Sequence, residues 1–307
     1  MMMAVPRALA ALLMVSPFAA ALPAVGSEQS TQSISETRTL YEAGSIAKFA
    51  CTIAILRLSD EGQLGLDDPV GALVPTLADL PAGRVKLRHV LANRSGIADG
   101  LAAAARADVG AVMAISDPAE AALRFGAGDL IHEPGSAWSY DLINWMIAQA
   151  VIEQVTGEEL DQALSRLVLG PAGMLGSRVF AGFGGPDLAK PLVPSRPLPR
   201  FLQCAGGLVT NPDDLELLVR FPHRGALSKA AQKELSTVTT PEESYTLGGR
   251  FRVTDRGALI SWQSGSNGSY RSFAVYDVGK DEALAGMTAN ANMKRINELR
   301  EVWLAER

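Results

Sequence analysis

The stretch AGSIAK, residues 43–48, opens an apolar run that reaches Leu58, and the rest of the chain is interpreted outward from it. Ser45 and Lys48 are three residues apart, so on a helix they share one face with Cβ atoms about 5–6 Å apart. The run is apolar on nearly all sides, which predicts a buried helix. A buried lysine loses its proton more readily than an exposed one, and the neutral amine can then activate a neighbouring serine hydroxyl.

This pair also has a plainer interpretation, in which Ser45 caps the helix and Lys48 extends along its surface to water. Ser45 is the only serine in the chain with a lysine three positions later. That spacing occurs by chance about once in a chain of this length at average residue usage. The pair therefore needs support from other parts of the sequence.

The composition is that of a globular protein with one large domain or two lobes. The chain has 307 residues, of which 48% are hydrophobic and 20% charged, with a net charge of −5. This acidic balance, without a basic cluster, argues against nucleic acid. The three histidines lie in no His-Glu-x-x-His pattern and the cysteines in no Cys-x-x-Cys pattern, so we expect neither a metal nor another cofactor.

The N-terminal residues 1–26 have the pattern of a secretory signal peptide. Arg7 precedes an apolar segment of about 15 residues, and small residues follow at 21–26. The segment is too short for a comfortable membrane span, although a retained anchor is the alternative. We therefore expect a secreted, periplasmic protein with no stable membrane span after processing. Cys51 and Cys204 would find oxidising conditions there, but two buried thiols explain them equally well, and we expect them unpaired.

The order of the expected elements is a helical middle, then strands, then a helix. Alternating patterns predict strands over residues 250–254, 258–263, 270–278 and 283–288, joined by short turns as an antiparallel meander. An amphipathic helix over residues 292–305 closes the chain. This order predicts an α+β fold with a mostly helical lobe and a sheet lobe.

Several segments in order along the chain carry a family resemblance. They are Ser-x-x-Lys at residues 45–48, EGQLGLDDPV at 61–70, VLANRSGI at 90–97, the segment 134–157 that contains Tyr140, and AGGL at 205–208 followed by Asp-Leu at 214–215. Together they resemble the serine β-lactamase and penicillin-binding protein superfamily. The similar branch holds class C β-lactamases, D-Ala-D-Ala carboxypeptidases and related esterases.

The resemblance implies a β-lactamase/transpeptidase-like fold, in which an antiparallel sheet flanked by helices adjoins a mostly helical lobe. It places one catalytic domain over residues 27–307. Within that domain, the helical lobe covers about residues 50–240. The sheet lobe covers about residues 245–307 together with residues 36–48.

The resemblance also implies roles for individual residues. Ser45 would be the nucleophile that accepts the acyl group, Lys48 its proton partner, and Tyr140 the group that passes a proton to the leaving group. The backbone N–H groups of Ser45 and Ser266 would form the oxyanion hole. The neighbouring substrate-binding strand would contain Gln263, Ser264 and Gly265. For Tyr140 the alternative is a packing aromatic residue beside Trp138.

Two positions depart from the family pattern. Leu142 stands where the second motif has an asparagine, and Asn144 would compensate only in part. Gln263 stands where the third motif has a lysine or histidine, and it brings no charge. A site that holds a substrate carboxylate needs a cation, which one of the arginines Arg250, Arg252 and Arg271 would have to supply. The change at position 263 counts against a true β-lactamase or D-Ala-D-Ala peptidase and leaves room for an esterase or amidase whose substrate lacks this carboxylate.

The third departure concerns the start of the domain. About 20 residues separate the signal peptide from Ser45, which is too few for the helix and two strands that the family places there. With these N-terminal strands missing, the strand at 283–288 would become an exposed edge. Either the sheet is abbreviated, or a second copy pairs with the edge to form a homodimer.

The sequence therefore predicts a secreted serine hydrolase that acts on a small-molecule or peptide-like ester or amide through an acyl-enzyme on Ser45. Whether the substrate is an ester, a β-lactam or a D-Ala peptide is left open. The alternative is a catalytically impaired member of the same family that acts as a binding protein. Leu142, Gln263 and the missing N-terminal strands motivate that alternative.

Overall fold

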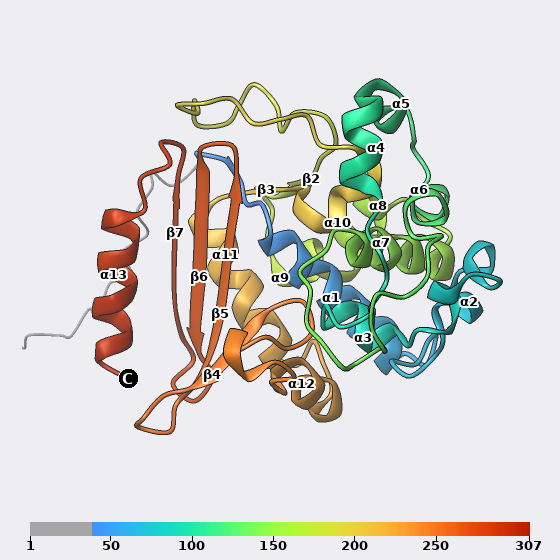
Figure 1. Cartoon of the computed structure of the whole chain (residues 1–307). Helices are drawn as coiled ribbons and strands as arrows, with labels where there is room; N and C mark the ends of the chain where they lie inside the picture. Colours follow the sequence, from blue (N-terminus) through green and yellow to red (C-terminus); the bar gives the residue numbers. More distant parts are fainter. Residues whose placement is uncertain (1–38) are drawn as a thin grey trace, which may run out of the picture. The chain divides into compact units, whose positions relative to one another are not determined.

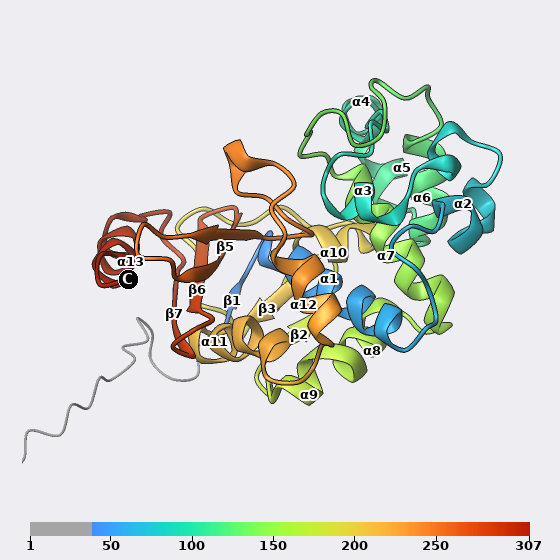
Figure 2. The same ribbon diagram turned by 90° about the horizontal axis from the view of Figure 1, so that it is seen from below.

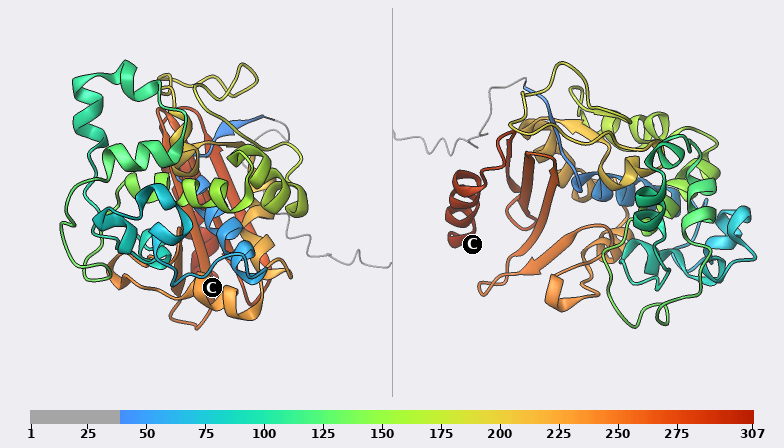
Figure 3. Two further views of the ribbon diagram at one scale, coloured as in Figure 1. Left: turned by 90° about the vertical axis from the view of Figure 1, so that its right-hand side faces the viewer. Right: turned by 45° about the horizontal axis from the view of Figure 1, so that its top comes forward.

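The buried helix α1 (Ile46–Asp60) lies at the centre of the fold. The computed structural model describes residues 39–307, so the predicted signal peptide and the start of the predicted domain lie outside the described residues. Twelve of the 15 residues of α1 are buried, as the apolar run predicted. Figures 2 and 3 show α1, in blue, between the main sheet, in orange and red, and the helix α7 (Ile143–Thr156), in green.

The main sheet is the antiparallel meander expected from the sequence. Its strand order is β4-β5-β6-β7. The strands are β4 (Arg250–Val253), β5 (Leu259–Asn267), β6 (Tyr270–Asp277) and β7 (Glu282–Thr288). Each connection joins neighbouring strands (Figure 1), so the pairing follows from short turns between strands of alternating pattern. The predicted strand at 283–288 is β7, an edge of this sheet within residues 39–307; the homodimer stays a prediction.

Two helices cover the main sheet on opposite faces. Side chains alternate along β6, so its odd-numbered and even-numbered residues face different layers. Phe273 and Val275 pack with Ile296 of α13 (Lys294–Ala305). The neighbouring Ala274 and Tyr276 belong to the main core, which includes the apolar residues of α11 (Pro212–Arg220) and α1. The second face therefore joins the sheet to the helical part of the fold.

A smaller sheet leads the chain into α1. It has the order β1-β3-β2, with β1 (Tyr41–Glu42), β3 (Leu208–Thr210) and β2 (Arg178–Val179). β1 therefore pairs with β3 and not with a strand of the main sheet. Side chains link this region to the main sheet: the Ser272 hydroxyl of β6 donates a hydrogen bond of 2.7 Å to the Ala43 carbonyl, and the Asn267 amide of β5 donates one to the Glu42 carboxylate.

The remaining helices lie on the far side of α1 from the main sheet or beside it (Figure 2). They are α2 (Val70–Leu73), α3 (Leu87–Leu91), α4 (Leu101–Ala107), α5 (Val109–Met113), α6 (Pro118–Phe125), α8 (Leu160–Leu164), α9 (Gly170–Ala172), α10 (Gln203–Gly206) and α12 (Lys229–Ser236). Among residues 39–307, none of the helices has both the length and the apolar character that crossing a bilayer requires.

The two cysteines form a disulfide, so the expectation of two free thiols is wrong. Cys51 of α1 and Cys204 of α10 have Cα atoms 5.8 Å apart, a separation that a disulfide spans without backbone movement. Both residues are fully buried. Their pairing depends on the packing of α10 against α1, a contact between segments 153 residues apart that local sequence patterns do not reveal.

Candidate active site

Ser45 and Lys48 meet at the start of α1, as the spacing predicted. Ser45 is the N-cap residue, but its side chain makes no capping hydrogen bond. Lys48 Nζ lies 3.2 Å from Ser45 Oγ and donates a second hydrogen bond of 2.6 Å to the Ala205 carbonyl. The lysine is only 2% exposed, so it does not extend along the surface to water. The plainer interpretation of the pair is therefore contradicted.

Burial gives Lys48 the character of a base. Removal of the amine from water lowers its pKa from 10.5 to about 7, because the charged form loses its hydration. No carboxylate among residues 39–307 forms an ion pair with it. Its nearest aromatic neighbours are the rings of Tyr140 and Trp145, whose centroids lie 5.0 and 5.6 Å from Nζ. Near neutral pH a large share of the amine is unprotonated and can accept the Ser45 proton.

Tyr140 approaches Ser45 from the segment before α7. Its hydroxyl is hydrogen-bonded to Ser45, and desolvation raises its pKa above the ordinary value, an effect that the Ser45 hydrogen bond and the charge of Arg250 reduce. The phenol is therefore protonated at neutral pH and can donate a proton. The ring also packs against Trp138 and Tyr245, with centroids 5.9 and 6.2 Å away. Packing and the contact with Ser45 thus occur together.

The main sheet brings the second backbone N–H group close to Ser45. A methyl group on Gly265 would lie 2.9 Å from the Ser45 nitrogen, and one on Gly44 would lie 2.6 Å from the Ser266 nitrogen. Gly44 has φ 56°, a conformation that favours glycine. Because two glycines allow these backbones to touch, the backbone nitrogens of Ser45 and Ser266 lie close together at the pocket that both residues line. Two backbone donors in such a place can stabilise an oxyanion.

These residues open into a pocket of about 470 Å³. Its lining comprises Ser45, Trp138, Tyr140, Arg250, Ser264, Gly265, Ser266, Arg271, Ser272 and Met293. The lining holds two cations and no carboxylate. Arg250 forms an ion pair of 3.4 Å with Glu243, whereas the Arg271 guanidinium donates hydrogen bonds to the backbone carbonyls of Gly268 and Tyr270.

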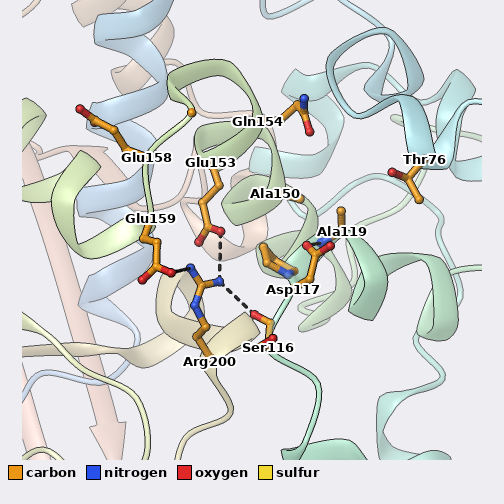
Figure 4. Close-up of a pocket in the computed structure, with 12 residues that line it drawn as sticks. Thr76, Ser116, Asp117, Ala119, Ala150, Glu153, Gln154, Glu158, Glu159 and Arg200 are labelled. Atoms are coloured by element: carbon orange, nitrogen blue, oxygen red, sulfur yellow. Dashed lines mark hydrogen bonds and ion pairs between the residues drawn. The ribbon is translucent and has the colours of Figure 1, made fainter.

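A larger pocket, of about 730 Å³, has no such chemistry (Figure 4). It lies beside α6 and α7 and is lined by the acidic residues Asp117, Glu153, Glu158 and Glu159 around Arg200. Arg200 pairs with Glu153 at 3.0 Å, and no serine–lysine pair is present among the lining residues. No group of three or more potential metal ligands occurs within residues 39–307. The Ser45 pocket is therefore the candidate active site.

Comparison with known families agrees with this geometry. The model of the Beta-lactamase family matches residues 23–306. The chain belongs to this family. Esterase EstB of Burkholderia gladioli is 34% identical over 148 residues, which cover 44% of this chain and 37% of the esterase. Penicillin-binding protein 4* of Bacillus subtilis is 26% identical over 146 residues, which cover 47% of this chain and 32% of that protein. The matched region thus spans about a third of the length of these curated relatives.

Solved structures of other proteins share the fold. A D-stereospecific amidohydrolase from Streptomyces sp. superposes with a TM-score of 0.70 at 22% identity and covers 83% of each chain. A penicillin-binding protein from Bacillus halodurans gives a TM-score of 0.70 at 20% identity, with 86% of each chain covered. These likenesses confirm the predicted β-lactamase/transpeptidase-like fold.

At the third motif of this β-lactamase family member, Gln263 does not line the pocket. Its side chain is buried, and its Nε2 atom donates to the Ser261 hydroxyl at 3.1 Å and the Arg250 carbonyl at 3.4 Å. Strand alternation is the reason: Gln263 pairs with Ala274, whose side chain faces the main core. Ser264 and Ser266 of the same predicted strand do line the pocket, so Gln263 differs from them in facing away from it.

Of the three arginines expected as alternative cations, two line the pocket and one does not. Arg250 and Arg271 line the pocket, whereas Arg252 does not. The Arg252 guanidinium lies 5.5 Å from the centroid of the Trp262 ring, on the sheet face that packs against α13. The pocket thus contains cations, although neither occupies the position of the third motif's lysine.

At the second motif of this β-lactamase family member, an apolar side chain replaces the expected amide. Leu142 is half-buried against the main core, where it makes no hydrogen bond through its side chain. Asn144 is buried and does not reach the pocket; its Nδ2 atom donates to the Asn93 Oδ1 atom at 3.3 Å. The same Oδ1 atom accepts from the Trp145 indole at 3.2 Å. Asn144 thus belongs to a buried cluster and does not take the place of the missing amide.

Sequence reasoning missed three neighbours of the site. Ala205 supplies the carbonyl that holds Lys48, and Asn93 anchors the cluster behind it. Both residues lie in motifs on which the family resemblance rests, so those motifs could have identified them. Tyr245 packs against Tyr140 and Trp138 but lies in no motif, so only the folded chain identifies it.

Proposed function

We propose that this chain is a secreted serine hydrolase that transfers the acyl group of an ester or amide to water through an acyl-enzyme on Ser45. One observation carries the proposal: the Ser45 hydroxyl lies 3.2 Å from a buried lysine amine whose pKa is about 7. Tyr140 is hydrogen-bonded to the same serine. Membership of the Beta-lactamase family and the esterase and amidohydrolase names of its relatives support the same chemistry.

Acylation begins when neutral Lys48 accepts the proton of Ser45 while Oγ attacks the substrate carbonyl carbon. The negative charge that develops on the carbonyl oxygen is stabilised by the N–H groups of Ser45 and Ser266. Tyr140 then donates its proton to the leaving alkoxide or amine, and the Lys48 ammonium returns a proton to the phenolate. The leaving group has thereby gained the tyrosine proton, the proton that left Ser45 has been replaced on Tyr140 through Lys48, and the acyl group is bonded to Ser45.

Deacylation repeats the proton transfers with water in place of the serine hydroxyl. Water attacks the acyl carbon and gives its proton to the Lys48–Tyr140 pair, the same N–H groups stabilise the oxyanion, and Ser45 Oγ leaves with a returned proton. The products are a free acid and the original enzyme. Tyr140 and Lys48 therefore act in both halves of the reaction.

The pocket favours a small substrate with an anionic group. Arg271 lines the pocket and donates its hydrogen bonds to backbone carbonyls, and no carboxylate within residues 39–307 forms an ion pair with it. An arginine in such a position can bind a substrate carboxylate through charge-assisted hydrogen bonds. Because Gln263 lies outside the pocket, this arginine would replace the cation of the third motif.

The acyl-enzyme is tested by intact-mass spectrometry after incubation with a fluorophosphonate, a fluorescent penicillin and a panel of ester probes. The wild-type chain is expected to gain the mass of one acyl or phosphonyl group, and the Ser45→Ala variant to gain none. Absence of labelling by every probe on folded wild-type protein would remove the proposal. The mass of the exported protein in the same spectra tests cleavage near residue 26.

The second candidate function is a binding protein that retains the fold without turnover. Leu142 favours it, because this position offers no hydrogen bond to a substrate amide. This candidate predicts that ligands raise the melting temperature while p-nitrophenyl acetate and nitrocefin are not hydrolysed. It also predicts that Ser45→Ala leaves binding intact, which the acyl-enzyme proposal does not.

A further inference from the structure

Two links join α1 to α10 next to the proposed base. The first is the hydrogen bond of 2.6 Å from Lys48 Nζ to the Ala205 carbonyl. The second is the disulfide between Cys51 and Cys204. Cys51 follows Lys48 by three residues and shares its helix face, and Cys204 directly precedes Ala205. The disulfide therefore fixes the segment that presents the carbonyl to the lysine.

The helix α10 depends on such external support. It has four residues, Gln203–Gly206, and a helix this short is not stable through its own hydrogen bonds. It lies between a short 3₁₀ turn, Arg200–Leu202, and Gly207. Without tertiary contacts the position of the Ala205 carbonyl would not be defined.

The helix α10 is also held by a buried polar network from α7. Gln149 Oε1 accepts a hydrogen bond of 3.3 Å from the Cys204 N–H group, and Gln149 Nε2 donates to Gln203 Oε1 at 3.3 Å. Gln149 also donates to Glu153 at 2.9 Å, and Glu153 pairs with Arg200 in the larger pocket (Figure 4). The disulfide and this network thus both hold α10 in place.

The direction of the Lys48 lone pair depends on the same carbonyl. A neutral amine that donates one hydrogen to Ala205 can turn its lone pair toward the Ser45 hydroxyl proton. We propose that the Cys51–Cys204 disulfide positions the general base: by fixing Ala205 it keeps Lys48 Nζ directed at Ser45 and closed to water. This inference rests on the proposed roles of Ser45 and Lys48.

Because Lys48 is buried among these elements, the pKa of its amine indicates whether they remain packed. Burial alone is what lowers its pKa to about 7. The titratable group that faces it is Tyr140, behind which lie Tyr245 and Arg250. From α7 it meets the Trp145 ring, and from α10 the Ala205 carbonyl. If α10 is released, water enters and the pKa of Lys48 rises toward its ordinary value.

The test is the double variant Cys51→Ala/Cys204→Ala of the full chain, which leaves no unpaired thiol. NMR titration of the Lys48 side chain, assigned with Lys48→Met, measures the amine directly and does not depend on turnover. In the double variant the pKa of the Lys48 amine is expected to rise by about one unit. About a tenth of the amine would then be neutral at pH 7, in place of about half. The acidic limb of the pH profile for ester hydrolysis is expected to move equally, and kcat/KM at pH 7 to fall about fivefold with little change in KM.

One control separates positioning from loss of stability. Leu77→Ala removes a buried side chain in the short turn Pro75–Leu77 and lowers stability without a link to Lys48; it is expected to leave the titration and the pH profile unchanged. Should the double alanine variant not fold, Cys51→Ala/Cys204→Val refills part of the lost volume.

An unshifted Lys48 titration in a folded double variant would overturn the inference and leave the proposed function intact. Absence of turnover in the wild type would remove the proposed function, while the titration would still decide whether the disulfide holds the lysine.

Discussion

Gly265 of β5 lies against Ser45 at the start of α1, so that a methyl group on Gly265 would lie 2.9 Å from the Ser45 nitrogen. The contact joins the strand that carries one proposed oxyanion donor to the residue that supplies the other. A side chain at position 265 would also meet the Ala43 carbonyl oxygen, which belongs to the backbone and cannot rotate away. The two backbones therefore have to separate if position 265 is anything but glycine.

Gly265→Ala is accordingly expected to reduce turnover by about 10²–10³-fold, the cost of losing one oxyanion donor. The measurement is ester hydrolysis together with the rate of fluorophosphonate labelling, with circular dichroism as the check on folding. Gly128→Ala is the matched control, because its added methyl would meet only the Ala98 side chain, at 3.6 Å. Wild-type turnover in folded Gly265→Ala would show that the two N–H groups do not act as a pair.

Burial of Lys48 predicts a dependence of stability on pH. Its pKa is about 7 in the folded protein and near 10.5 in the unfolded chain, so between these values the unfolded state binds more protons. Stability therefore rises with pH across this window, and at or below pH 7 the buried amine is a net cost. Lys48→Met is expected to unfold at higher urea concentration than the wild type at pH 7, and the difference is expected to shrink by pH 10.

The same substitution separates stability from activity. Lys48→Met is expected to reduce ester turnover by about 10²–10⁴-fold, the range for loss of a general base. Wild-type turnover is expected to rise with pH through about 7 as the amine loses its proton. A variant that is both less stable than the wild type at pH 7 and equally active would contradict both parts of this prediction.

How far the sequence predicts the site depends on the range of the contacts. The Ser45–Lys48 pair and the meander are set by local spacing, and both were predicted. Gln263 was expected in the pocket. Which side chains of a strand face the pocket is decided only when the strand packs against α1, so the sequence alone could not show that Gln263 lies outside it. The disulfide joins residues 153 positions apart, and no local pattern indicates which segments meet. Tyr245 reaches Tyr140 through the same kind of long-range packing.

Tyr140→Phe tests the proton relay without removal of the ring. The phenyl group would still pack against Trp138 and Tyr245, so stability is expected to change little. Turnover is expected to fall by about 10²–10⁴-fold because the leaving group no longer receives a proton. Tyr276→Phe is the matched control, because it also removes a tyrosine hydroxyl, one that is hydrogen-bonded to Asp281 at 2.8 Å. Tyr276 lies on the face of the main sheet opposite to α13. Equal turnover in the two variants would assign Tyr140 to packing alone.

Arg271→Gln tests whether the pocket binds an anion. For a pair of esters that differ only in a carboxylate near the scissile bond, KM of the anionic ester is expected to rise about 10–100-fold, the worth of a charge-assisted hydrogen bond. The neutral ester is expected to be unaffected, because the glutamine keeps hydrogen-bonding capacity and loses only the charge.

The control for this substitution is Arg252→Gln, on β4 of the same sheet, which removes an equal charge outside the pocket. It is expected to leave KM unchanged for both esters, since a surface charge that makes no direct contact is screened by salt. An equal rise in KM for the anionic ester in both variants would mean that the overall charge of the protein attracts the substrate and that Arg271 does not contact it. A rise confined to Arg271→Gln would assign the missing cation of the third motif to a neighbouring strand.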